Sequence, residues 1–161
     1  MQKTLILGYG NPDRQDDGVA WHILTSVAKR AGLLAPDSPD EELMLLDTQP
    51  ALMFTLQLTP EMAEMLAAYQ RVCFVDAHTG RVKEDVHLEE LKPLFQGSPL
   101  THHLTPESCL ALAASLYGGA PKAILVSVRG FQFEFEQSLS PETCKLAEQA
   151  VDLIWNWISA N

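Results

Sequence analysis

Three separate segments of this sequence contain side chains whose types and spacing suit acid–base or metal chemistry. Asp16 and Asp17 are adjacent carboxylates near the start, Asp76 lies near the middle, and His102 and His103 form an adjacent pair beyond it. Neighbouring carboxylates can serve as general acid and base, or as oxygen ligands of a metal ion. If the fold brings two carboxylates and an imidazole together, they form a ligand set suited to Ni²⁺, Zn²⁺ or Mn²⁺.

Each of these side chains also has an ordinary structural role open to it. Asp16 could cap the helix that follows, a role that suits Asp17 less because it lies one position further along. Asp76 could be a turn residue that binds its own backbone. A single histidine more often packs than binds a metal, so His102 or His103 alone would carry little weight. The prediction of a site therefore depends on the convergence of all three segments.

The first acidic pair follows a strand–turn–helix pattern. Leu5–Leu7 is a short apolar run typical of a buried strand, Gly8 and Gly10 permit a sharp turn, and a helical pattern begins near Gly18. In an open α/β sheet such a loop lies at the carboxyl edge, where these folds place their binding sites. The glycines alone would suggest a dinucleotide, but Asp13 takes the third glycine position of that motif and would repel a pyrophosphate.

Further strands are indicated by apolar runs. The runs at 72–75 and 123–128 are continuous, as in strands buried on both faces of a parallel sheet. Either 53–58 or 43–46 could lie beside the first strand, and 86–91 is predicted as an edge strand.

Helices are predicted between these strands. A hydroxyl residue, a proline and a glutamate mark three helix starts, because they supply a cap, a fixed φ and a favourable charge. These starts are Thr59-Pro60-Glu61, Thr105-Pro106-Glu107 and Ser140-Pro141-Glu142. Alternating strands and helices predict one α/β domain over residues 1–161, a three-layer α/β/α sandwich around a mainly parallel twisted sheet of about five strands.

Composition limits the classes of partner. The formal net charge of the 161 residues is −10 and no basic patch is visible, so we expect no nucleic-acid partner. No apolar stretch reaches the roughly 20 residues of a membrane span, so we expect no membrane partner. Cys73, Cys109 and Cys144 are odd in number and flanked by apolar residues, which predicts buried free thiols in a cytoplasmic protein.

The segment from Gly130 to Glu136 alternates aromatic and polar residues. This alternation is typical of a half-buried strand or hairpin. The alternative is an exposed apolar rim that grips a protein partner.

The ordered set of motifs resembles the [NiFe]-hydrogenase maturation endopeptidases over nearly the whole chain. The resemblance is carried by residues 7–12 with Asp16-Asp17-Gly18, by Val75-Asp76-Ala77 and by residues 101–104. Residues 56–61 look most like the branch that serves soluble, NAD(P)-linked hydrogenases.

The resemblance implies an α/β/α sandwich that binds a nickel-type ion through Asp17, Asp76 and His102, with His103 as the alternative imidazole. It implies removal of the C-terminal extension from the hydrogenase large-subunit precursor after nickel insertion. The nickel could be supplied by that substrate, and Zn²⁺ or Cd²⁺ could substitute for it. Asp17 and Asp76 would be catalytic, and Asp16 is a hypothetical base.

Substrate recognition departs from the family pattern. The family has Asp-Gly-Gly-Thr after its second strand, and here Gln57 and Thr59 stand in that place, so we expect them to contact the substrate.

Two other classes of function stay open. Peptidyl-tRNA hydrolases also begin with a strand and Gly-x-Gly-Asn-Pro, but they need a basic surface for tRNA. A non-catalytic metal-binding module would use the same acids without cleaving anything.

Overall fold

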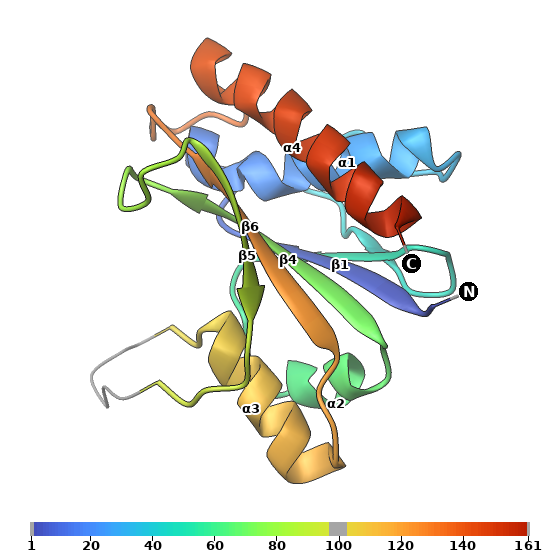
Figure 1. Ribbon diagram of the computed structural model, residues 1–161. Helices are drawn as coiled ribbons and strands as arrows, with labels where there is room; N and C mark the ends of the chain where they lie inside the picture. Colours follow the sequence, from blue (N-terminus) through green and yellow to red (C-terminus); the bar gives the residue numbers. More distant parts are fainter. Residues whose placement is uncertain (1, 97–102, 161) are drawn as a thin grey trace.

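The computed structural model describes residues 2–96 and 103–160, and His102 therefore lies outside the described residues. Strands and helices alternate along most of the chain (Figure 1). In order they are β1 (Thr4–Tyr9), the 3-10 turn η1 (Gln15–Gly18), α1 (Val19–Arg30), β2 (Met44–Leu45), β3 (Ala51–Thr55), α2 (Met62–Ala67), β4 (Arg71–His78), β5 (Val86–Leu91), α3 (Pro106–Tyr117), β6 (Lys122–Arg129) and α4 (Pro141–Ser159).

The strands form a six-stranded sheet in the order β2-β3-β1-β4-β6-β5. The four inner strands are parallel, and the edge strands β2 and β5 each pair antiparallel to their neighbour. The predicted mainly parallel α/β sheet and the edge strand at 86–91 are confirmed. Two segments were candidates for the place beside β1. The segment at 53–58 overlaps β3, which pairs with β1, and the segment at 43–46 contains the two-residue strand β2 on the outer side of β3.

Helices cover both faces of the sheet. Figure 1 shows α1 and α4 on one side and α2 and α3 on the other. Because successive strand residues point to opposite faces, each inner strand contributes to two cores. Ile6 and Val75 pack in the core under α1 and α4, whereas Leu5 and Phe74 pack in the core under α2 and α3. Each such fully buried side chain contributes about 1.5–3 kcal/mol of stability.

The strand order reverses between β1 and β4. From β1 the chain crosses by way of α1 to β3 on one side, whereas from β4 it passes by way of β5 and α3 to β6 on the other side. Connections that leave in opposite directions open a crevice at the carboxyl ends of the two strands, which is where open α/β sheets bind ligands. The residues that follow β1 and end β4 therefore face one another across this crevice.

Two of the three predicted helix starts are confirmed. The hydroxyls of Thr105 and Ser140 cap α3 and α4 by accepting hydrogen bonds from the backbone three residues on. The third predicted helix is present as α2, but its predicted cap is wrong, because α2 begins at Met62 and has no side-chain cap. There the Met62 N–H donates to the carbonyl oxygen of Thr59 at 3.1 Å, so the chain makes a turn before the helix.

Two other expectations need correction. Cys73 and Cys109 are buried free thiols as predicted, but Cys144 is exposed in the first turn of α4. Residues 131–135 form no strand of the sheet and instead make an irregular loop between β6 and α4. None of the helices in residues 2–96 and 103–160 is both long and apolar enough to cross a membrane.

Candidate functional site

Two of the predicted acids, Asp17 and Asp76, meet at the crevice between β1 and β4. Asp17 lies in η1 just after β1, and its Oδ2 accepts a hydrogen bond from the Asn11 N–H at 2.9 Å. Gly10 allows this close approach: its φ is +142°, and a Cβ there would lie 2.2 Å from the backbone oxygen of Asp17. The glycine turn therefore serves to bring the acidic loop against the end of the strand.

Asp76 lies inside β4, two residues before the strand ends, rather than after it as the apolar run suggested. Its Oδ1 accepts a hydrogen bond from the Ala77 N–H at 2.7 Å. Burial raises the pKa of Asp76 to about 7, and the charge of Asp17 adds to the rise, while Ala77, Tyr9 and Arg81 oppose it. Asp76 therefore exchanges its proton near neutral pH, as a general acid or base must.

Tyr9, the last residue of β1, completes this arrangement and was not singled out by the sequence reasoning. The pairing of Gly8 with Val75 puts Tyr9 beside Asp76 at the next step of the register, and both side chains face α2 and α3. Burial raises the pKa of Tyr9 above its usual range, and the nearby Asp76 raises it further. The phenol therefore keeps its proton and interacts with the Asp76 carboxyl group.

Asp16 has a different role from its neighbour. Its side chain is fully buried and accepts five hydrogen bonds, two from the loop after β6 and three from the start of α4. The donors are Phe131 N (2.8 Å), Gln132 N (2.9 Å), Ser140 N (2.8 Å), Ser140 Oγ (2.6 Å) and Thr143 Oγ1 (2.9 Å).

This environment makes Asp16 a structural anchor. Burial acts to raise its pKa, but the hydrogen bonds from Ser140, Phe131 and Gln132 outweigh it, so the net pKa is lowered. A buried, ionised carboxylate with five donors is poorly suited to accept a substrate's proton. Asp16 is also no cap of α1, because α1 begins after Gly18 without any side-chain cap.

The histidines are only partly described. His103 is exposed just before α3, and its backbone oxygen accepts a hydrogen bond from Gln96 Nε2 at 3.1 Å. Within residues 2–96 and 103–160 no group of three acidic, histidine or cysteine side chains is arranged to hold a metal. The imidazole of the predicted ligand set thus stays a prediction.

The two carboxylates supply oxygen atoms of the kind that divalent metal cations bind. Asp17 acts on Asp76 as a like charge, and their oxygen atoms are the donors that a cation would share. A cation between them would remove the repulsion that helps to keep Asp76 protonated.

The predicted substrate contacts lie near this edge. Gln57 is exposed and Thr59 is half-buried in the segment that follows β3. β3 ends next to β1, and the Gly10 N–H donates to the Thr55 carbonyl oxygen at 3.2 Å. Their contact with a substrate remains a prediction, although they lie at the side of the crevice where a substrate could reach them.

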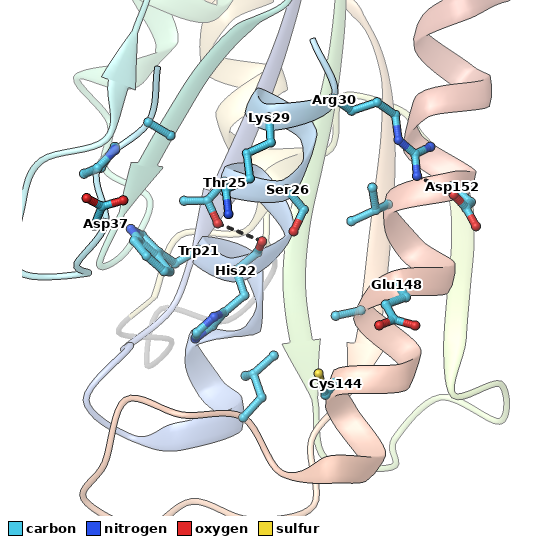
Figure 2. Close-up of a pocket in the computed structure, with 15 residues that line it drawn as sticks. Trp21, His22, Thr25, Ser26, Lys29, Arg30, Asp37, Cys144, Glu148 and Asp152 are labelled. Atoms are coloured by element: carbon cyan, nitrogen blue, oxygen red, sulfur yellow. Dashed lines mark hydrogen bonds and ion pairs between the residues drawn. The ribbon is translucent and has the colours of Figure 1, made fainter. Parts of the chain in front are cut away.

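A separate groove of about 690 Å³ lies between α1 and α4 (Figure 2). Thr25 and Cys144 line it, and an ion pair of 2.7 Å joins Arg30 of α1 to Asp152 of α4. Neither carboxylate of the crevice lines this groove. It therefore belongs to the packing of the outer helices and not to the candidate site.

Solved structures of hydrogenase maturation proteases share this open, mainly parallel α/β fold. Hydrogenase maturation protease HycI from Thermococcus kodakarensis KOD1 superposes with a TM-score of 0.65 at 18% identity, over 98% of this chain and 93% of that one. The maturating endopeptidase HybD from E. coli superposes with a TM-score of 0.65 at 16% identity, over 98% and 92%. HybD from Thermococcus kodakarensis gives 0.66 at 15% identity, over 97% and 99%.

Sequence comparison adds nothing to this structural likeness. No protein-family model matches the chain, and no curated protein matches it. At these identities the solved structures establish the shared fold.

Proposed function

We propose that this protein is an endopeptidase that removes the C-terminal extension of a [NiFe]-hydrogenase large-subunit precursor after nickel insertion. The observation that carries the proposal is the meeting of Asp17 and Asp76 at the switch point of the sheet. The fold shared with hydrogenase maturation proteases over nearly the whole chain supports it. The motif at residues 56–61 favours a precursor of the NAD(P)-linked branch.

In this proposal Asp17 and Asp76 bind nickel together with His102, or with His103 in its place. The ion would polarise the scissile carbonyl group or lower the pKa of a water molecule. Two carboxylates and one imidazole leave coordination positions open, so nickel already held by the precursor could be shared. Cleavage would then depend on whether the precursor is loaded with metal. Zn²⁺ or Cd²⁺ could occupy the same ligands.

The protein side chains have separable roles in this scheme. Asp76, with a pKa near 7, can hold or release a proton at the crevice as the substrate binds. Tyr9 orients the Asp76 carboxyl group from the neighbouring strand. Gln57 and Thr59 would contact the precursor from the end of β3. The buried thiols Cys73 and Cys109 suit the reducing cytoplasm that we propose as its location.

The proposal is tested by incubating the protein with a nickel-loaded large-subunit precursor and measuring the mass of the large subunit. We expect the wild type to shorten it, and Asp17→Asn and Asp76→Asn to leave it intact while circular dichroism shows an unchanged fold. Asp13→Asn is the matched control, because Asp13 is an exposed acid of the same loop.

The possible outcomes separate the competing functions. Normal processing by either Asp17→Asn or Asp76→Asn would remove the metal-site proposal. A wild type that binds nickel but never shortens the precursor would favour a non-catalytic metal-binding module. Salt-sensitive binding of tRNA would instead favour a peptidyl-tRNA hydrolase, against the expectation from the net charge of −10.

A further inference from the structure

The loop between β6 and α4 presents two phenylalanine rings to solvent. Phe131 is 41% exposed and Phe135 is 85% exposed, while Phe133 between them is half-buried. The Phe133 ring packs so closely that a Cβ on Gly130 would lie 2.7 Å from it. The aromatic alternation in the sequence therefore turns one ring inward and two rings outward.

Each outward ring lies under a guanidinium group. The guanidinium carbon of Arg129 is 4.8 Å from the centre of the Phe131 ring, and that of Arg14 is 4.6 Å from the centre of the Phe135 ring. These contacts hold the rings in place while leaving them accessible. Aromatic side chains, phenylalanine among them, and arginine are enriched at protein–protein interfaces.

The backbone of this loop is held by buried polar side chains. Asp16 accepts hydrogen bonds from the N–H groups of Phe131 and Gln132, and the Gln15 side chain accepts one from Glu134 N at 3.2 Å. Gln15 is only 3% exposed and has a φ of +51°, a conformation that costs about 1–3 kcal/mol outside glycine. The fold thus keeps a strained residue and a buried carboxylate at the base of an exposed aromatic loop.

The loop lies beside the proposed active site. It follows β6 at the carboxyl edge of the sheet, and its anchor Asp16 is the residue before Asp17 (Figure 1, the orange segment leading from β6 to α4). On the other side of the crevice Leu56, after β3, is 62% exposed. β3 and β6 are three strand spacings apart, or about 14 Å, which about four residues of extended chain would span.

We propose that Phe131 and Phe135 form a preorganised docking surface for the protein substrate, and that Asp16 and Gln15 are its positioning residues. The inference rests on the proposed function. Its occupant is an apolar, extended polypeptide segment of the large-subunit precursor that crosses the crevice from the Leu56 side. Docking on both sides would hold the scissile bond over Asp17 and Asp76. Because the loop is already ordered, binding would cost little conformational entropy.

The test compares two double variants of the full-length protein. Phe131→Ala/Phe135→Ala removes the docking rings. Leu116→Ala/Tyr117→Ala removes two exposed apolar side chains at the C-terminal end of α3 and serves as the control. Both pairs are on the surface, so both variants are expected to fold, which thermal unfolding checks. The measurements are KM and kcat for cleavage of the nickel-loaded precursor, and Kd for its binding by biolayer interferometry.

We expect the phenylalanine variant to raise KM and Kd about tenfold or more, with kcat within about twofold of wild type. The control variant should match wild type in all three constants. If the wild type cleaves the precursor and the phenylalanine variant binds it as tightly as the control does, the docking surface is refuted and the proposed function stands. If the wild type neither binds nor cleaves the precursor, the proposed function itself is refuted.

Discussion

Asp16→Asn should separate a structural anchor from a catalytic base, because the replacement keeps the shape of the side chain and removes its charge. Four donors share Oδ2 of Asp16 and one backbone N–H uses Oδ1. In whichever orientation the amide settles, its NH₂ group must face at least one backbone N–H, which loses its acceptor. That orphaned donor costs about 1–3 kcal/mol, and each charge-assisted hydrogen bond weakened to a neutral one costs about 1 kcal/mol.

With one orphaned donor and four weakened hydrogen bonds, we expect Asp16→Asn to lower the free energy of unfolding by about 5–7 kcal/mol at pH 7. A loss of this size is a large part of the 5–15 kcal/mol typical of a domain. Asp17→Asn is the matched control, since Asp17 is half-buried and its carboxylate accepts a hydrogen bond from the Asn11 N–H. It should cost about 1 kcal/mol or less. Urea unfolding followed by circular dichroism measures both changes.

The stability difference between the wild type and Asp16→Asn should also depend on pH, in a direction set by the pKa of Asp16. The folded-state pKa of Asp16 is lowered, so its contribution to stability is present above the unfolded-state pKa of about 4 and is lost as the pH falls through the folded-state value. The gap between wild type and Asp16→Asn should therefore narrow below pH 4. A variant within about 1 kcal/mol of wild type at pH 7, yet unable to process the precursor, would refute this reasoning and restore Asp16 as a base.

Three further predictions concern the crevice. The pKa of Asp76 is raised to about 7, so its ionisation destabilises the folded state as the pH rises from about 4 through 7. Asp76→Asn should therefore be more stable than the wild type, and this advantage in thermal unfolding should be roughly 2 kcal/mol larger at pH 8 than at pH 5. An advantage of the same size at both pH values would contradict the raised pKa of Asp76. His102→Ala and His103→Ala, made separately, should differ in nickel affinity by calorimetry, because only the loss of the ligand should weaken nickel binding. Wild-type nickel affinity in both variants would exclude both histidines as ligands. Gly10→Ala should displace Asp17, because its Cβ would meet the Asp17 backbone oxygen at 2.2 Å, and processing should fall at least tenfold; full activity would show that the loop can shift.

Much of the fold follows from local patterns in the sequence. The strands β1, β4 and β6 are buried on both faces of the sheet. Such strands appear in a sequence as continuous apolar runs, a pattern that few other elements share. Thr105 and Ser140 mark helix starts because each cap is made within four residues. Asp17 and Asp76 could be paired from the sequence because parallel strands bring their carboxyl ends to one edge.

Features that depend on distant partners could not be predicted in this way. The donors to Asp16 lie 115–127 residues further along the chain, so nothing near it in the sequence distinguishes it from Asp17. The backbone turn that delays α2 to Met62 competes with the cap expected at Thr59, and local propensity does not say which wins. Aromatic alternation at 131–135 resembles a strand, but the hydrogen bonds of this loop go to Asp16 and Gln15 instead of to a neighbouring strand.

The exposed Cys144 makes the chain convenient for spectroscopy. Burial raises the pKa of Cys109 to about 12 and that of Cys73 still further, so neither forms a reactive thiolate at neutral pH. A maleimide fluorophore should therefore attach at Cys144 alone, without any engineered cysteine. That site is one residue beyond Thr143, which binds Asp16 directly. The emission of the label would report when the base of the aromatic loop loosens, in real time and in unmutated protein.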